Sequence, residues 1–290
     1  MTAIVARLED LAQHDAVLAP LARLYVLVLR LIDTTESSLV AVPSTQRPPE
    51  SHLSVPLLHQ QTLAIDLGMI ERLLQEASEL LAEHGLPESQ ALVEAVAERR
   101  LSALELLQAG VQGNAVAFEQ LARSTRLAVQ LMTVLGNVLS IPVLALASRV
   151  ISFREPLRWQ VGYCPHCAAW PTLAEFRGLE RERWLRCGRC GTGWRYPHQQ
   201  CPFCENSNHR SLRYFAEEGK QDSQRVEVCE QCRGYLKTFA TLGPWSLGEI
   251  LLQDLATVEF DFLAQDRGYQ RPEGLGYPLE VQIVAQELLA

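Results

Sequence analysis

The chain has 290 residues and a formal net charge of −8, and 48% of its residues are hydrophobic against 21% charged. This composition is typical of a soluble globular protein and excludes a disordered one, and the length predicts two or three domains. Residues 156–240 carry 13 basic and 9 acidic side chains, whereas the parts on either side are acidic. The basic centre fits either an acidic partner or an ordinary solvated surface.

We expect a cytoplasmic protein that does not cross a membrane. The first fifteen residues include Arg7, Glu9 and Asp10, which are incompatible with a secretory signal. The longest apolar runs, Leu24–Leu29 and Ile141–Ala147, are shorter than the roughly 20 residues of a spanning helix. Thiols stay reduced in the cytoplasm, so the eight cysteines favour metal binding over disulfides.

Residues 1–150 contain no cysteine and repeat apolar residues at helical spacing, which predicts a bundle of about five helices. A short first helix holds Leu8 and Leu11, and Pro20 begins the second, because proline suits a first helical turn. The third helix carries apolar residues from Leu63 to Leu81 and ends at Gly85.

Two further helices complete the expected bundle. One opens at Pro87 and continues through Ala97 to Leu104. Asn114 is the expected N-cap of the other, whose apolar face reaches Leu135, and Pro142 interrupts the helix that follows.

From residue 161 to residue 241 the pattern changes to short strands separated by Gly, Pro or Asn, and helix returns only after Pro244. Ser246 and Glu249 form a capping box for a helix that extends to Phe262. We expect a last helix over Leu279–Leu288. The expected strands are Leu173–Phe176, Arg183–Arg186, Leu212–Phe215 and Arg225–Val228.

All eight cysteines lie in four C-x-x-C pairs. This spacing lets a tight turn direct both sulfurs to one ion, and two such turns (knuckles) supply four tetrahedral ligands. Sequential pairing leaves 19 and 24 residues between the paired knuckles, which is close to the spacing of metal ribbons, and we favour it over an interleaved arrangement. The expected sites are Cys164, Cys167, Cys187 and Cys190 (site 1) and Cys201, Cys204, Cys229 and Cys232 (site 2).

Four thiolates fill the coordination sphere and leave no position for a substrate, so we expect no hydrolytic chemistry at the metal. Tetrahedral sulfur suits zinc and iron alike, and iron can in addition change its oxidation state. Histidine ligands are unnecessary with eight sulfurs, so His166 is expected near site 1 but not on its ion. Four tryptophans are expected to pack around site 1, namely Trp159, Trp170, Trp184 and Trp194.

The surroundings of the cysteines carry a specific resemblance. The segments Trp184-Leu185-Arg186-Cys187, Cys201-x-x-Cys204, Cys229-x-x-Cys232-x-x-Tyr235-Leu236-Lys237, Asp254-Leu255-Ala256 and Gln265-Asp266-Arg267-Gly268-Tyr269 resemble the FdhE family of formate dehydrogenase accessory proteins. The resemblance implies a non-enzymatic cytoplasmic factor that assembles respiratory formate dehydrogenases by binding their catalytic subunit. It also implies two rubredoxin-like iron ions, with zinc as the alternative, one at each expected site.

The sequence thus predicts an α+β protein. An α-helical bundle over residues 1–155 precedes one metal ribbon at 156–200, a second at 201–242 and a helical segment at 243–290. The alternative functions are a rubredoxin-like electron carrier and a zinc-ribbon nucleic-acid-binding protein. The acidic pI of about 5.5 disfavours nucleic acid as the partner.

Overall fold

A computed structural model describes residues 2–35, 40–41, 54–151 and 159–286. The chain forms two compact units. We call residues 1–46, 58–152 and 279–290 the helical unit, and residues 47–57 and 153–278 the sheet unit. This division differs from the four segments expected from the sequence, because the ribbons share one unit and the chain's end returns to the helices.

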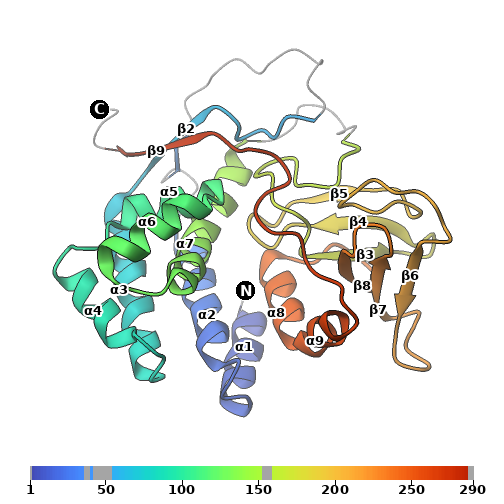
Figure 1. The fold of residues 1–290 in the computed structure, drawn as a ribbon, viewed down its shortest axis with the longest axis horizontal. Coiled ribbons are helices and arrows are strands. Elements are labelled where there is room, and N and C mark those ends of the chain that lie inside the picture. Colours follow the sequence, from blue (N-terminus) through green and yellow to red (C-terminus); the bar gives the residue numbers. More distant parts are fainter. Residues whose placement is uncertain (1, 36–39, 42–53, 152–158, 287–290) are drawn as a thin grey trace. The chain divides into compact units, whose positions relative to one another are not determined.

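Within its described residues, the helical unit contains seven helices (Figure 1). The long helix α7 packs on α2, α5 and α6, and its middle is buried from Val138 to Ala147. Gly110 of α5 faces Gly136 of α7 so closely that a Cβ atom on Gly110 would lie 2.0 Å from the Gly136 carbonyl oxygen. The helices are α1 (Thr2–His14), α2 (Ala19–Thr34), α3 (Leu67–Glu83), α4 (Ser89–Ala97), α5 (Ala103–Gln112), α6 (Ala115–Thr125) and α7 (Val129–Val150).

The helix ends follow local chemistry. The Asn114 side chain accepts a hydrogen bond from the backbone N–H of Ala117, as expected of an N-cap, and Pro20 lies in the first turn of α2. The third helix begins later than predicted, because Asp66 caps it by accepting from Met69 N–H. It ends as expected, with Gly85 at a φ of 64°.

Three expectations about helix breaks were wrong. Pro142 lies inside α7, where buried neighbours on both sides hold the two helical segments in place despite the lost backbone hydrogen bond. Conversely, Arg99 and Arg126 take positive φ values of 55° and 60° and separate helices that the apolar spacing had joined. Apolar periodicity continues across such turns, so it does not reveal them.

The predicted last helix is instead a strand. Strand β9 (Val281–Ala285) pairs in parallel with β2 (Gln61–Ile65), which is antiparallel to β1 (Val40–Ala41). The alternation of buried Val281, exposed Gln282 and buried Ile283 has the period of a strand. The Gln108 side chain of α5 fixes this strand by accepting from Ile283 N–H at 2.9 Å.

Helix α7 is also long and apolar enough to span a membrane by length and composition, with a mean hydropathy of 1.9. The sequence expectation of no such segment was therefore too strict, because it counted uninterrupted apolar runs. In the structure 72% of the most apolar 18-residue stretch of α7 is buried inside the protein, as in the core helix of a globular unit.

The sheet unit is built on a six-stranded sheet in the order β5-β4-β3-β8-β7-β6. The two ribbons share one plan. The first knuckle is followed by two antiparallel strands, then by the second knuckle, and then by a third strand. Parallel pairing of β3 with β8 joins the two plans into one sheet. The strands are β3 (Leu173–Arg177), β4 (Glu182–Arg186), β5 (Gly193–Arg195), β6 (Leu212–Phe215), β7 (Gln224–Cys229) and β8 (Tyr235–Thr241).

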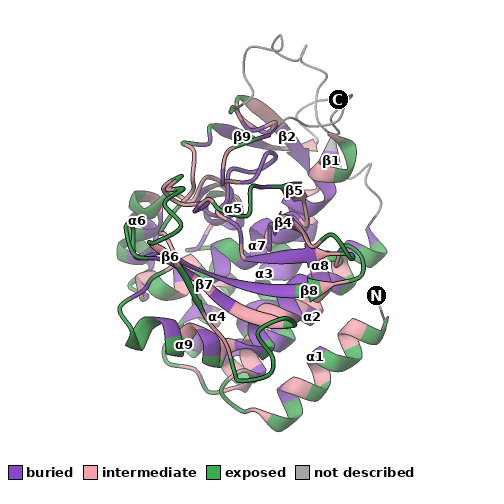
Figure 2. Cartoon of the chain, turned by 90° about the vertical axis from the view of Figure 1, so that its right-hand side faces the viewer, coloured by how far each residue is buried: buried purple, intermediate pink, exposed green. Residues whose placement is uncertain are grey.

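The burial of each strand follows its position in the sheet. The central strands β3 and β8 are buried along most of their length, whereas the edge strand β6 is exposed or half-buried (Figure 2). Four of the six strands match the sequence expectation within one or two residues, and β5 and β8 were missed. The two ribbons are therefore not independent modules, since they share a continuous sheet.

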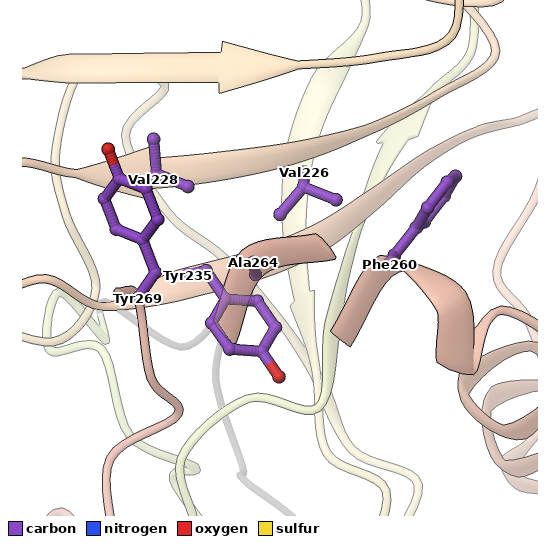
Figure 3. Packing of buried hydrophobic residues seen from close by; sticks show 6 residues of the cluster. All are labelled: Val226, Val228, Tyr235, Phe260, Ala264 and Tyr269. Carbon is purple, nitrogen blue, oxygen red and sulfur yellow. The ribbon is translucent and has the colours of Figure 1, made fainter. Parts of the chain in front are cut away.

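One face of the sheet is covered by α8 (Leu247–Ala256) and α9 (Val258–Asp266), with Ser246 capping α8 as predicted. Thr257 interrupts what the sequence had suggested to be a single helix. Phe260 and Ala264 of α9 pack on Val226, Val228 and Tyr235 (Figure 3). Apolar burial on this face therefore fixes α9 to the second ribbon, while Ile250 of α8 packs with Leu173 and Phe239 of β3 and β8.

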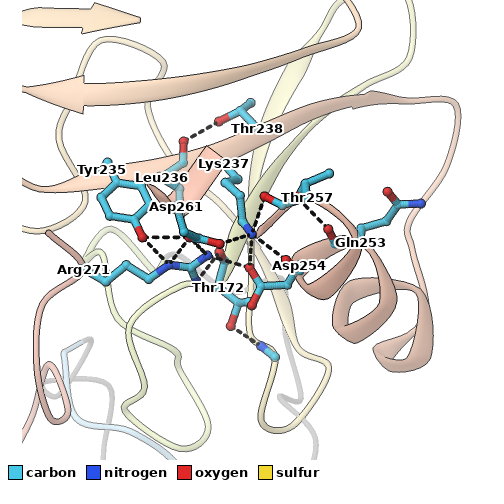
Figure 4. A network of polar contacts seen from close by, with 11 residues as sticks. Thr172, Tyr235, Leu236, Lys237, Thr238, Gln253, Asp254, Thr257, Asp261 and Arg271 are labelled. Carbon is cyan, nitrogen blue, oxygen red and sulfur yellow. Dashed lines mark hydrogen bonds and ion pairs between the residues drawn. The ribbon is translucent and has the colours of Figure 1, made fainter. Parts of the chain in front are cut away.

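A buried polar network strengthens the same contact (Figure 4). The Lys237 side chain has no exposed surface, and its Nζ lies 2.8 Å from carboxylate oxygens of both Asp254 and Asp261. Arg271 Nη2 also reaches both carboxylates, at 2.6 and 2.7 Å, and the Tyr235 hydroxyl donates to Asp261. Burial raises the pKa of Asp254, but Arg271 and Lys237 outweigh that effect and hold it below its ordinary value. Both carboxylates are therefore matched by two cations.

Candidate metal centres

The four C-x-x-C turns have the same backbone hydrogen bonds. In each turn the N–H of the first cysteine donates to the carbonyl five residues on, and its own carbonyl accepts from the residue four on. In the first turn these bonds join Cys164 to Ala169 and Ala168 at 2.8 and 3.1 Å. The repetition shows that one local structure holds all four thiol pairs.

A left-handed residue follows the second cysteine in every turn. Gly191 has a φ of 79°, and Ala168, Glu205 and Arg233 adopt values near 60°. Non-glycine residues rarely adopt this conformation, so the turn is held by its surroundings at three of the four positions. A search for glycine would have found only one of these turns.

The thiols meet in sequential pairs, not interleaved ones. In site 1, Cys164 Sγ lies 3.5 Å from Cys190 Sγ, and Cys167 Sγ lies 3.5 Å from Cys187 Sγ. In site 2 the sulfurs of Cys201 and Cys232 are 3.6 Å apart, and those of Cys204 and Cys229 are 3.7 Å apart. Within each group all four sulfurs lie within 4.8 Å of one another.

These distances fit metal tetrathiolates. A metal–sulfur bond of about 2.3 Å in a regular tetrahedron gives a sulfur–sulfur edge of about 3.8 Å, close to the spacings in both groups. They are far longer than a disulfide bond, and all eight cysteines are free thiols. The chain therefore contains two tetracysteine groups that could each hold a metal ion. Tetrahedral sulfur at this spacing suits iron and zinc alike.

Polar neighbours support the sulfurs. The Cys190 thiol lies 3.1 Å from Thr192 Oγ1, which in turn lies 3.0 Å from His166 Nδ1. In site 2 the Asn206 amide donates to Cys229 Sγ at 3.5 Å. Sequence reasoning missed Thr192 and Asn206, although each stands two residues after the second cysteine of its knuckle.

Backbone and side-chain donors favour one thiolate in each group. At Cys187, burial raises the thiol pKa, but hydrogen bonds from neighbouring thiols outweigh it and lower the pKa well below the ordinary value. At Cys229 burial acts in the same direction, and donation by Cys232 N–H and Asn206 lowers the pKa to about 7. Burial raises the pKa of Cys232 to about 11. The sites therefore combine ready thiolates with thiols that release a proton when a metal binds.

Aromatic side chains occupy several places around the knuckles. The Trp194 indole is buried and donates to the Val161 carbonyl at 3.2 Å, and Trp159 donates to Tyr163 O. Trp170, which follows the first knuckle, meets Phe203 of the third knuckle edge to face at 5.7 Å. Trp184 instead packs under the Arg177 guanidinium. The four tryptophans therefore fill different positions and do not form one cluster.

The two groups differ in exposure. All four thiols of site 1 are buried, whereas Cys232 of site 2 is exposed and Cys204 is half-buried. Solvent and chelators can therefore reach site 2 without opening the fold.

We expect N-ethylmaleimide to modify Cys232 first in the metal-loaded protein, because a reagent needs access to the sulfur. Modification of Cys187 should be at least roughly tenfold slower, since it requires local opening of the unit. Mass spectrometry of peptides taken over time checks this order, and labelling in denaturant provides the reference for equal reactivity. Equal rates at Cys187 and Cys232 in the folded protein would contradict the difference between the sites.

The fold and the two thiol groups define a class: proteins in which a helical unit accompanies a sheet unit with paired tetracysteine groups. Residues 199–275 match the family model described as FdhE, C-terminal domain. The resemblance noted in the sequence is thereby confirmed over this part of the chain.

Two relatives and one solved structure carry the same family name as the matching model. The chain is 32% identical over 135 residues to a protein named FdhE homolog from Aquifex aeolicus, and 37% identical over 112 residues to one from Stutzerimonas stutzeri. These alignments span 46% and 37% of this chain, and 47% and 35% of the relatives' lengths. The crystal structure of the FdhE protein from Pseudomonas aeruginosa matches 95% of this chain and 94% of its own, with a TM-score of 0.55 and 21% identity. That likeness shows a shared fold.

Proposed function

We propose that this protein is a cytoplasmic accessory factor that binds the catalytic subunit of a respiratory formate dehydrogenase during its assembly. The observation that carries the proposal is the FdhE C-terminal domain over residues 199–275, which contains all four thiols of site 2 and the network around Lys237. The same domain supplies the exposed edge strand β6, where a partner can reach the fold.

In this proposal each tetracysteine group holds one metal ion through sulfur alone, and iron is the ion we favour over zinc. A bound iron would supply one-electron redox chemistry. The chain's own residues hold the four sulfurs at tetrahedral spacing and keep water from site 1 by burial. Four protein ligands leave no open position on the ion, so the factor acts by binding and not as an enzyme.

The test is an affinity pull-down of the tagged full-length chain from the native cytosol. We expect the formate dehydrogenase catalytic subunit among the proteins recovered, and deletion of the gene should lower formate dehydrogenase activity without lowering its transcript. If activity survives the deletion and no such subunit is recovered, the assembly function is wrong and the electron-carrier alternative becomes the leading one.

A further inference from the structure

The two knuckles of site 2 are supported by different neighbours. The fourth knuckle is held through Arg233, which directly follows it. The Arg233 side chain donates to the Gly268 carbonyl at 3.2 Å, and Gln270 N–H donates to the Arg233 carbonyl at 2.8 Å, so the segment after α9 fixes this knuckle. The third knuckle lies instead against the first ribbon. An ion at site 2 would therefore join two parts of the sheet unit that are positioned separately.

Both residues between the thiols of the third knuckle contact the first ribbon. A Cβ atom on Gly162 would overlap the carbonyl of Pro202, so the two backbones touch directly. The Phe203 ring meets the Trp170 indole edge to face, with the ring centroids 5.7 Å apart. Gly162 and Trp170 lie on either side of the first knuckle. The surroundings of one knuckle of site 1 therefore support one knuckle of site 2.

The Phe203 ring also reaches the other half of site 2. A Cβ atom on Gly234, two residues after Cys232, would lie 2.5 Å from this ring, so only glycine allows the ring to approach here. Phe203 therefore contacts the surroundings of the first knuckle and of the fourth. A shift of the first knuckle would move Trp170 away from Phe203 and weaken the support of both knuckles of site 2.

The chain between the two sites provides a second connection. Ten residues separate Cys190 of site 1 from Cys201 of site 2. In this connector the buried Tyr196 hydroxyl donates to the Cys201 carbonyl at 3.1 Å, and Arg183 of β4 donates to the Gln200 carbonyl at 2.8 Å. The second knuckle lies between β4 and β5, so order at site 1 extends through this connector to the first thiol of site 2.

We propose that the two sites bind metal cooperatively, because an ion in site 1 orders the third knuckle for site 2 through the contact of Trp170 with Phe203. Thiols must be ordered when an ion binds, and order already present from one site lowers that cost at the other. Linkage is reciprocal, so an ion in site 2 strengthens binding at site 1 by the same factor. The inference rests on the proposal that each site holds an ion, and it is independent of the assembly partner.

The difference in exposure gives the two sites different roles. All four thiols of site 1 are buried, whereas Cys232 is exposed, so site 2 can gain or lose its ion while site 1 stays closed. Site 1 is therefore the site that retains its ion. Site 2 is the exchangeable site, and its affinity depends on whether site 1 is filled.

The experiment titrates the metal-free full-length protein with Co²⁺ against a competing chelator, under reducing and oxygen-free conditions. Tetrahedral cobalt thiolate absorbs visible light, so the absorbance counts the filled sites. Cys229→Ser gives the binding constant of site 1 alone, and Cys187→Ser gives that of site 2 alone. The coupling factor is the constant for filling both sites of the unmodified protein, divided by the product of these two constants.

Two tryptophan substitutions test the proposed link. Trp170→Leu removes the contact with Phe203 and leaves all eight thiols in place. Trp184→Leu is the matched control, because Trp184 is also half-buried in the first ribbon but packs on Arg177. We expect a coupling factor of at least about tenfold, so site 2 still fills in Cys187→Ser but more weakly. Trp170→Leu should lower the factor at least roughly threefold, and Trp184→Leu should leave it unchanged.

A second measurement needs no loss of a thiol, so it holds even where a serine variant fails to fold. Excess chelator is added to the fully loaded protein, and the faster phase of cobalt loss comes from the exposed site 2. Trp170→Leu should speed this phase at least roughly threefold, because lost affinity appears mainly in the dissociation rate.

A coupling factor near one, or equal effects of the two tryptophan substitutions on coupling and on release, would overturn the proposal. Absence of cobalt binding at either thiol group would overturn it together with the two metal sites. Recovery of the formate dehydrogenase subunit in the pull-down is a separate result, so failure of the cooperative link and failure of the assembly function are distinguishable.

Discussion

Replacing Lys237 with methionine should lower the free energy of unfolding of the sheet unit by about 3–5 kcal/mol, because it leaves a buried carboxylate without its cation. Lys237 has no exposed surface and serves both Asp254 and Asp261. Arg271 alone cannot neutralise two carboxylates, so the variant carries one uncompensated charge between β8, α8 and α9. Methionine nearly preserves the volume, so the effect reports charge and not a cavity.

All five tryptophans lie in the sheet unit, at positions 159, 170, 184, 194 and 245, so tryptophan fluorescence during denaturation reports this unit. The other lysine of the chain, Lys220, is exposed and pairs with Glu217 on the surface. Lys220→Met is therefore the matched control and should change the unfolding free energy by less than about 0.5 kcal/mol. Similar effects of the two substitutions would show that the buried network is not what fixes α8 and α9.

Replacing Cys187 with serine should remove the ion of site 1 while site 2 keeps its own. Structural zinc contributes about 10–16 kcal/mol of apparent binding energy in small four-ligand peptides, and a three-sulfur site loses much of that energy. All four thiols of site 1 are buried, so the knuckles it joins would separate inside the unit. We expect early proteolytic cuts between residues 161 and 200 and lower recovery of the partner in the pull-down.

The helical unit supplies the internal reference for this variant. It contains no cysteine, so its helices should stay protected from protease when site 1 is lost. Gln231→Ala changes an exposed residue inside the fourth knuckle and spares every thiol, so it should behave like the unmodified protein. Cleavage that begins in the helical unit of Cys187→Ser would mean that the metal supports the whole protein.

The sequence predicted local features well. The N-caps at Asn114 and Ser246, the end of a helix at Gly85 and four of the strands depend on nearby residues alone. The grouping of the thiols in sequence order was also anticipated, because loop lengths of ribbon size favour neighbouring knuckles.

The features that it missed depend on long-range contacts. Nothing near Val281–Ala285 indicates the partner strand β2, which lies more than 200 residues earlier in the chain. The parallel pairing of β3 with β8 likewise joins residues about 60 positions apart and turns two expected ribbons into one sheet. Pro142 shows the same limit, since buried packing maintains a helix that the residue itself disfavours.

We propose that the chain holds two metal ions, each ligated by the four sulfurs of one tetracysteine group. Elemental analysis combined with X-ray absorption of the protein purified from its native cytosol tests it most directly. We predict two ions per chain and a first shell of four sulfurs near 2.3 Å, with a red colour if the ion is ferric iron. One ion per chain, or nitrogen or oxygen in the first shell, would contradict the assignment of the eight cysteines to two complete sites.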